Sequence, residues 1–310
     1  MSIRHFFTVD VEEYFQVAAL APWAPRTRWE SFESRVELQV DRLLELLGRY
    51  DAHGTFFTVG CVAERHPSMI RAIVSAGHEL AGHTWDHRRV TGQTPDEFRE
   101  SIRRTKQTLE DLGGTPVIGF RAPSFSILRG TEWSLDVLIE EGYRYDSSLF
   151  PVRRRGYGYV GGRRDPYWID RPAGRLAEIP PATLQIGWMT LPAAGGAYFR
   201  LLPYALVRSA LRSAESRSVP ATFYIHPWEY DPEQPRLPVS FLTGLRHYAK
   251  LGGVWPRLER LLGEFRFTAI VEGLNRELSA RSPARGSRRH SPERSQLNVA
   301  PDHHADSPLG

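Results

Sequence analysis

Apolar and polar positions follow two alternating periods along the first half of the chain. Residues 5–10, "HFFTVD", form a short apolar run typical of a buried strand, and residues 33–50 repeat apolar positions at helical spacing. The strand-like runs "GTFFTVG" and "HELAGHT" follow between residues 54 and 84, and the run between them, "AERHPSMIRAIVSAG", predicts a helix over residues 63–77. A regular exchange of strands and helices predicts an α/β fold built on a parallel sheet, open or closed into a barrel.

The next stretch continues the pattern with a clear helix start. Residues 94–114 place Thr94 at the N-cap and Glu97 at the capping-box position, so a helix is predicted there. Strand-like runs follow at residues 116–123 and 143–148. In folds of this kind, chemistry gathers where strands end and loops begin.

Residues 150–215 interrupt the rhythm, because arginine, glycine, proline and aromatic residues dominate them. We expect this segment to be an irregular insertion that shapes a binding surface. Strands at 222–225 and 264–270 restore the pattern. Residues 279–310 have no hydrophobic period and are rich in Ser, Pro and Arg, which predicts a disordered basic tail. We therefore expect one folded domain over residues 1–278.

Composition and charge limit the class of protein. With 310 residues, of which 41% are hydrophobic, the chain can bury a large core. The formal charge of +4 comes without any RNA- or DNA-reading motif, so we expect no nucleic-acid partner. The single cysteine, Cys61, excludes an internal disulfide bond. The sequence shows no signal peptide and no apolar run long enough to span a membrane, so we expect a cytoplasmic protein.

Two histidines four positions apart, His83 and His87 in "HTWDH", are the first candidate for chemistry. In a helix this spacing places two side chains about 5–6 Å apart on one face, and a loop can bring them together as well. A shared metal ion is one interpretation, and an ordinary solvated pair is the other. A metal site needs a third ligand, and a catalytic one also needs an acid–base partner.

Acidic side chains at the end of the first strand can supply both the third metal ligand and the acid–base partner. Alternate side chains share one face of a strand, so Asp10 and Glu12 project together. Neighbouring buried carboxylates repel each other unless one is protonated or a cation lies between them. Simple solvation at the strand end stays open as the alternative. Arg121 and His226 end two further apolar strands, and a guanidinium in that position can pair with a carboxylate and keep it ionised.

These residues fall in four motifs, "TVDVEE", "HTWDH", "RAPSFS" and "IHPW", whose order and spacing resemble those of polysaccharide deacetylases, the family 4 carbohydrate esterases. The resemblance covers residues 5–272, and "HTWDH" matches the family's H-(S/T)-x-x-H metal motif. The stretches "YDSSLFP", "EIPP" and "HPWEYDPEQP" are similar to the subgroup associated with exopolysaccharide and exosortase loci. The resemblance implies a distorted (β/α) barrel of about seven parallel strands, with residues 1–278 as the catalytic domain.

The resemblance also implies one divalent metal ion, usually Zn²⁺, held by two histidines and one carboxylate. His83 and His87 match the histidine ligands. The family's usual first motif has two adjacent aspartates, whereas this chain has "DVE". Strand alternation therefore favours Asp10 as the base and Glu12 as the third ligand, with Glu13 as the alternative.

The remaining motifs imply further roles. Arg121 would orient Asp10, and His226 would protonate the departing amine. Asp146 in "YDSS" would either orient His226 or serve only as a cap at the surface. The backbone N–H of Ser124 would help to bind an oxyanion. Four more side chains are expected to line an acetyl pocket or to stack on the sugar, namely Ile225, Trp228, Tyr14 and Phe125.

Together these expectations describe metal-dependent removal of N-acetyl groups from the amino sugars of a polysaccharide or its lipid-linked precursor, in bacterial exopolysaccharide biosynthesis. The implied partner is an N-acetylated glycan, and a lipid-linked substrate would bring the protein into peripheral contact with a membrane. Two alternatives stay open. One is hydrolysis of another non-peptide C–N bond, as in a cyclic amide or ureide, and the other is non-catalytic glycan binding.

Overall fold

The computed structural model describes residues 3–154, 156–193 and 195–274. Within these residues a nine-stranded sheet forms the centre of the fold. Its strands are β1 (His5–Val11), β2 (Thr55–Thr58), β3 (Glu79–Gly82), β4 (Gly119–Phe120), β5 (Tyr145–Asp146), β6 (Tyr167–Arg171), β7 (Gly174–Glu178), β10 (Thr222–Ile225) and β11 (Phe267–Thr268). The order is β10-β1-β2-β3-β4-β5-β7-β6, with β11 also paired to β1.

The sheet is mostly parallel and curves toward closure. Only the pairing of β6 with β7 is antiparallel among the strand pairs of this described sheet. Pro181, which follows β7, forms a parallel bridge with Thr222 at the start of β10, and the Ala182 N–H donates to the Thr222 carbonyl at 3.0 Å. This contact joins two distant parts of the curved sheet. The predicted α/β class with a distorted barrel is therefore confirmed.

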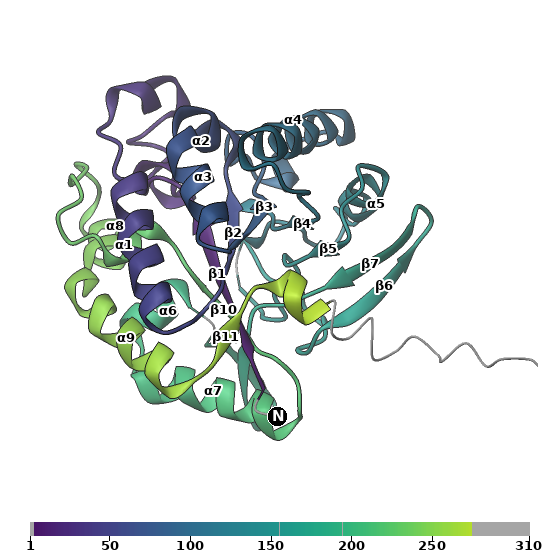
Figure 1. Ribbon diagram of the computed structural model, residues 1–310, viewed down its shortest axis with the longest axis vertical. Coiled ribbons are helices and arrows are strands. Elements are labelled where there is room, and N and C mark those ends of the chain that lie inside the picture. The colour runs from purple at the N-terminus through teal and green to yellow at the C-terminus, as the bar shows by residue number, and fades with distance from the viewer. Residues whose placement is uncertain (1–2, 155, 194, 275–310) are drawn as a thin grey trace, which may run out of the picture.

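Helices lie around the outside of this sheet (Figure 1). They are α1 (Val36–Arg49), α2 (Gly60–Arg65), α3 (Pro67–Ser75), α4 (Pro95–Gly113), α5 (Trp133–Glu140), α6 (Gly196–Leu201), α7 (Tyr204–Ser216), α8 (Phe241–Tyr248) and α9 (Val254–Glu264). The predicted capping box of α4 is present, since the Glu97 carboxylate accepts from the Thr94 N–H at 2.8 Å and the Thr94 hydroxyl accepts from the Glu97 N–H at 3.3 Å. None of the described helices is both long and apolar enough to cross a membrane.

Residues 150–215 are more regular than we expected. They contain β6, β7, α6 and most of α7, together with a separate hairpin of β8 (Thr183–Ile186) and β9 (Met189–Pro192). Strand β7 pairs with β5 and so belongs to the central sheet, and the β6–β7 hairpin forms its edge (Figure 1). The expectation of an irregular insertion is therefore wrong for much of this segment. The tail predicted for residues 279–310 lies outside the described residues.

Alternation along β1 separates the core from the site. Val9 is fully buried in the large hydrophobic cluster that includes Val40 and Leu43 of α1. The neighbouring Asp10 projects to the opposite face of the strand, because successive side chains alternate. Since the strands are parallel, their carboxyl ends meet at one edge of the barrel, where the candidate residues lie.

Candidate metal centre and active site

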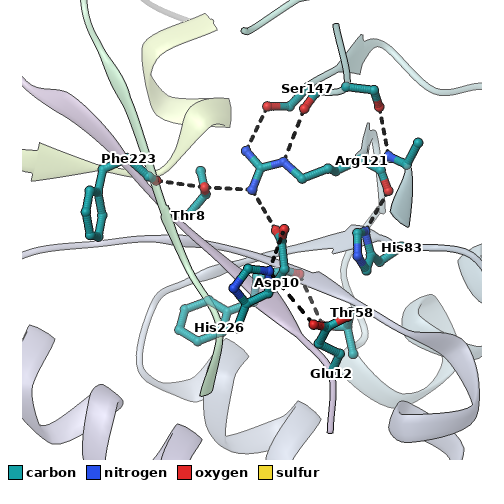
Figure 2. Close-up of polar contacts among 12 residues, drawn as sticks. Thr8, Asp10, Glu12, Thr58, His83, Arg121, Ser147, Phe223 and His226 are labelled. Atoms are coloured by element: carbon teal, nitrogen blue, oxygen red, sulfur yellow. Dashed lines mark hydrogen bonds and ion pairs between the residues drawn. The ribbon is translucent and has the colours of Figure 1, made fainter. Parts of the chain in front are cut away.

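Five parallel strands deliver polar side chains to this edge. Glu12 follows β1, His83 follows β3 and Arg121 follows β4. Ser147 follows β5, and His226 follows β10. Figure 2 shows that these side chains, far apart in the sequence, point toward one another. The strand-end rule applied to the sequence therefore locates one common site.

Glu12, His83 and His87 form a candidate metal triad. Each offers one ligand atom, these atoms lie within 4.8 Å of one another, and all three residues are buried. His87 Nε2 lies 2.5 Å from Glu12 Oε2, and the two imidazole centroids are 5.2 Å apart. His83 Nδ1 contacts the carbonyl of Arg121 at 2.7 Å, so its other ring nitrogen is the one that can ligate a metal.

The donor set fits a divalent cation. Glu12 Oε2 is buried and lacks a hydrogen-bond partner among the described residues, although His87 Nε2 is adjacent. Burial opposes the charge of Glu12, but His87, His226 and His83 outweigh it and hold the pKa of this carboxyl well below its usual range. Burial lowers the pKa of His83 to about 4, which keeps the ring neutral as ligation requires. Two imidazoles and one carboxylate are a typical catalytic zinc set.

Glu13, the alternative third ligand, lies elsewhere. Its carboxylate contacts the Ser34 hydroxyl and accepts from the Arg35 N–H at 3.1 Å, at the beginning of α1. Consecutive side chains in extended backbone point in different directions, so Glu13 cannot share the direction of Glu12. The structure therefore groups Glu12, and not Glu13, with the two histidines.

The histidine pair converges through a loop and not through a helix. The backbone at Thr84 and His87 has φ of 60° and 54°, in the left-handed region that residues other than glycine rarely adopt. The first N–H groups of α2 hold this loop: Gly60 donates to the Thr84 carbonyl at 2.9 Å, and Cys61 donates to the Trp85 carbonyl at 2.8 Å. Backbone strain of this kind is common at functional sites.

Arg121 is fully buried and bonded on several sides. Its Nη1 donates to Asp10 Oδ1 at 2.6 Å and to the Thr8 hydroxyl at 2.8 Å (Figure 2). Its Nε and Nη2 donate to the carbonyl and hydroxyl of Ser147 at 3.2 and 2.8 Å. The guanidinium also lies over the Phe57 ring, 4.1 Å from the centroid. This network fixes the orientation of the Asp10 carboxylate through a hydrogen bond to a charged group, and the pairing of Arg121 with a carboxylate is the contact that the sequence predicts.

His226 lies on the other side of the two acids. Its Nε2 is 3.7 Å from Asp10 Oδ2 and 3.8 Å from Glu12 Oε1. Its Nδ1 is 2.9 Å from Glu229 Oε2, and the other oxygen of Glu229 lies 3.6 Å from Nε of the buried Arg200. Burial opposes protonation, but the hydrogen bond and charge of Glu229, with Glu12 and Asp10, raise the pKa of His226 to about 9.

Asp146 does not orient His226, which corrects the expectation from the sequence. The Asp146 carboxylate accepts from the Ser148 hydroxyl at 2.5 Å and from the Ser148 N–H at 3.2 Å. It also lies opposite Glu178 in the register of β5 and β7. The partner of His226 is Glu229, which we did not predict. A signal for it exists, because His226 and Glu229 have capping-box spacing and the structure forms that box.

Trp228 borders the centre, whereas Ile225 does not. The indole N–H of Trp228 donates to Glu12 Oε1 at 3.0 Å, and its ring stacks on His226. Ile225 is 1% exposed, and strand alternation turns it to the face opposite His226. The expectation that Ile225 lines an acetyl pocket is therefore wrong, since its register partner is the core residue Val9.

Tyr14 and Phe125 pack in aromatic clusters and do not present open faces to a sugar. Tyr14 is 2% exposed and meets Phe15 edge to face. Phe125 is 7% exposed and meets Phe150 and Tyr224 in the same way. The expected stacking role of both rings is not supported by this arrangement, because a stacking platform needs an accessible ring face.

Ser124 lies in a short 3-10 turn over Pro123–Phe125, with φ of 54°. This turn is tied to β5, because the Ala122 N–H donates to the Ser148 hydroxyl at 2.8 Å and Ser148 bonds Asp146. The left-handed backbone is costly for serine, which is typical of a segment held for function. The role of the Ser124 N–H at an oxyanion stays a prediction.

The fold and these residues define a class of protein, a mostly parallel α/β barrel with a candidate His/His/carboxylate metal centre at the carboxyl ends of its strands. The family model described as polysaccharide deacetylase matches residues 27–145. A second model, described as a domain of unknown function (DUF3473), matches residues 147–275. Residues 27–145 are therefore similar to the polysaccharide deacetylase family, and the stretch that follows them is similar to the DUF3473 domain.

Individual proteins are similar to this chain in part of its sequence or in its fold. The chain is 28% identical over 113 residues to a peptidoglycan deacetylase from Helicobacter pylori, across 36% of this chain and 38% of that protein. Its structure is similar to that of a putative polysaccharide deacetylase from Mycobacterium smegmatis, with a TM-score of 0.60, 20% identity, and coverage of 95% and 96% of the two chains. A Puue allantoinase gives a TM-score of 0.55, 19% identity, and coverage of 90% and 91%.

These similarities differ in what they establish. The structural likenesses, at such low identity, show the fold. The matched stretch spans less than half the length of the Helicobacter pylori relative, of which it covers 38%. Both matched stretches contribute to the candidate centre, since His83 and Arg121 lie in the first and His226 and Glu229 lie in the second. Glu12 precedes both.

Proposed function

We propose that the protein is a metal-dependent hydrolase that removes N-acetyl groups from the amino sugars of a polysaccharide or its lipid-linked precursor, in bacterial exopolysaccharide biosynthesis. The observation that carries this proposal is the meeting of Glu12, His83 and His87, with Asp10 and His226 on either side. The similarity to a peptidoglycan deacetylase supports the class of substrate.

Glu12, His83 and His87 would hold the metal ion. A divalent ion bound there supplies Lewis acidity for the acetyl carbonyl and lowers the pKa of a coordinated water. Asp10 is suited to accept the proton of the attacking water. Its Oδ1 is engaged by Arg121 at 2.6 Å, whereas its Oδ2 faces His226. Arg121 thus holds the base in a fixed orientation.

His226 is suited to donate the second proton. Glu229 holds its Nδ1 at 2.9 Å and directs Nε2 toward the acids of the centre. A protonated Nε2 gives its proton to the departing amine, without which that poor leaving group would stay attached. Buried Arg200 lies beside Glu229 and balances its charge. Water is thereby added across the C–N bond, and the products are acetate and a free amino sugar.

The proposal is tested by metal analysis together with acetate release from a panel of N-acetylated glycans. We expect His83→Ala to lose both bound metal and acetate release, since a ligand is removed. Asp10→Asn should keep the metal and lose turnover by at least about a hundredfold, as removal of a general base does. His53→Ala, at a histidine that is 44% exposed and remote in sequence from the triad, is the matched control and should keep both.

Three results would contradict the proposal in different ways. Unchanged turnover in Asp10→Asn would remove Asp10 from the role of base. Metal-dependent hydrolysis of a cyclic amide or ureide, with no release of acetate from any glycan, would replace the substrate class. Stoichiometric metal with no hydrolysis of either kind of substrate would identify a glycan-binding protein.

A further inference from the structure

A cavity of about 430 Å³ adjoins His87 and extends away from the candidate metal centre along the loop that follows β1. Besides His87, its lining includes Phe15, Arg26, Trp29 and Arg89. Its volume falls within the range of small-molecule sites. Because a ligand of the proposed metal forms part of the wall, a group bound in this cavity would lie next to the reacting sugar.

The charge of the cavity is positive. Arg26 and Arg89 line it, and its described lining contains no aspartate or glutamate. Arg26 Nε lies 3.5 Å from Asp86 Oδ2, and both side chains are partly exposed, at 48% and 30%. Arg89 has no carboxylate within ion-pair distance in the described part of the chain, and its Nη2 donates to the Gly156 carbonyl. The cavity wall therefore carries two guanidiniums, and of these two only Arg26 has a carboxylate of the described residues within ion-pair distance.

An aromatic side chain, Trp29, lines the same cavity and lies beside Arg26. The indole N–H of Trp29 donates to the Ala24 carbonyl at 3.1 Å, which fixes the ring, and its other neighbour is the buried Phe15. The Arg26 guanidinium lies 5.7 Å from the centroid of Trp29. A fixed indole offers apolar area to a sugar ring, and guanidiniums suit the planar, bidentate recognition of carboxylate or phosphate.

We propose that this cavity is a subsite for an anionic sugar unit next to the N-acetylated one. Arg26 and Arg89 bind its carboxylate or phosphate group, and its ring packs against Trp29. The inference rests on the proposed function, because the cavity adjoins a residue of the proposed metal centre. It assigns the substrate to the acidic glycans, in contrast to a neutral polymer of N-acetylated sugars.

Calorimetric titration of the metal-loaded full-length protein tests this assignment with two matched pairs of probes. The first pair is a tetrasaccharide that alternates N-acetylglucosamine with glucuronate, and the same tetrasaccharide after reduction of its carboxyl groups to alcohols. The second pair is N-acetylglucosamine 1-phosphate and N-acetylglucosamine. We expect at least one anionic probe to bind about tenfold more tightly than its neutral partner at low salt. The pair that shows the preference identifies carboxylate or phosphate as the anion.

Single substitutions then test whether Arg26 and Arg89 cause the preference for the anionic probe. Arg26→Gln and Arg89→Gln should each reduce it at least about threefold, as expected when a charged hydrogen-bond donor is replaced. Arg26 is the first residue of a short 3-10 helix, Arg26–Ser31, and its side chain is half-exposed, so its variant carries little risk of misfolding. Arg49→Gln, at an exposed arginine near the end of α1 that pairs with Glu259, is the control and should leave the preference unchanged. Metal content and thermal unfolding check that each variant is folded.

Equal affinity within both pairs, or a preference that survives in both arginine variants, would overturn the subsite. The result is separable from the proposed function. Acetate release from neutral glycans without any anionic preference removes the subsite alone. Anionic preference without acetate release from any glycan supports the subsite and removes the deacetylase proposal.

Discussion

The residue that most distinguishes this centre is Glu12. The first motif contains "DVE", and the intervening Val11 is fully buried in the core. Because side chains alternate along a strand, Asp10 and Glu12 lie on one face. There Arg121 donates a hydrogen bond to Asp10, and His87 contacts Glu12. The two carboxylates therefore have different partners. Asp10 pairs with the guanidinium of Arg121, and Glu12 groups with the two imidazoles.

Glu229 gives the first prediction at this scale. Glu229→Gln removes the charge that holds His226 protonated and oriented, so acetate release should fall by about a hundredfold while bound metal is retained. Kinetics and metal analysis of the variant provide the measurement. Asp146→Asn is the comparison, because Asp146 bonds Ser148 and lies away from His226. A loss in Asp146→Asn as large as that in Glu229→Gln would contradict the assignment of the partner.

The sequence alone identifies the site residues that lie at the ends of parallel strands. Asp10, Arg121 and His226 each follow an apolar run, and parallel pairing brings them together without knowledge of the side chains. The partner of His226 depends on the turn after β10, which periodicity does not describe. Asp146 follows the same strand pattern, yet its side chain faces Glu178, and no local signal reveals this.

At the scale of elements, β5 and β7 present an unusual pair. Asp146 and Glu178 are register partners and are fully buried. Burial raises the pKa of Asp146 to about 6, and burial together with the charge of Asp146 raises the pKa of Glu178 well above its usual range. The folded protein therefore binds protons more tightly here than the unfolded chain does.

This pair predicts a pH dependence of stability. Groups with a raised folded pKa contribute their full stability below the unfolded pKa, near pH 4, and lose it as the pH rises through the folded value, near 6 for Asp146. Relative to Glu178→Gln, the wild type should lose up to about 1.4 kcal/mol of unfolding free energy per pH unit over this window. Urea unfolding from pH 4 to 7 measures the difference, and parallel curves for the two proteins would contradict it.

Two glycines test how tightly the elements pack. A Cβ on Gly119 of β4 would lie 2.0 Å from Cζ of Tyr145 in the neighbouring strand, whereas a Cβ on Gly48 of α1 would meet nothing within 4 Å. Gly119→Ala should therefore cost about 1–3 kcal/mol or more of unfolding free energy, as overpacking does. Gly48→Ala should add about 0.5–1 kcal/mol, because alanine is the better helix residue. Denaturant unfolding provides both values, and equal effects of the two changes would contradict the packing.

Helices and strands with strong local sequence signals could be predicted, whereas those that depend on contacts with distant residues could not. The capping box begins α4 where expected, and β10 ends before His226 as expected. The helix predicted for residues 63–77 is interrupted, because Pro67 begins a new helix there. Strand β7, "GRLAE", has little apolar content and depends on pairing with β5 and β6, so periodicity alone does not reveal it.

At the scale of the whole molecule, the two stretches matched by different family models form one sheet. Strand β1 pairs with β2 on one side and with β10 on the other, and β10 lies in the stretch that matches DUF3473. His226 and Trp228 from that stretch complete the surroundings of Glu12. The chain is therefore expected to fold as a single cooperative unit.

Unfolding experiments test this cooperativity. We expect one transition for the full chain, with coincident loss of secondary structure and of tryptophan signal. A fragment of residues 1–146 lacks β10 and should neither fold cooperatively nor bind metal stoichiometrically. Two separate transitions, or a stable fragment that retains metal, would show that the matched stretches are independent domains.

The proposed function depends on one cation that joins Glu12, His83 and His87 between Asp10 and His226. Anomalous diffraction from crystals of the zinc-loaded protein tests it most directly, with Glu12→Gln and Glu13→Gln crystals beside the wild type. We expect one strong peak at about 2.0–2.2 Å from a Glu12 oxygen and from one ring nitrogen of each histidine. The peak should be weaker in Glu12→Gln and unchanged in Glu13→Gln. A peak elsewhere, or one that vanishes only in Glu13→Gln, would contradict it.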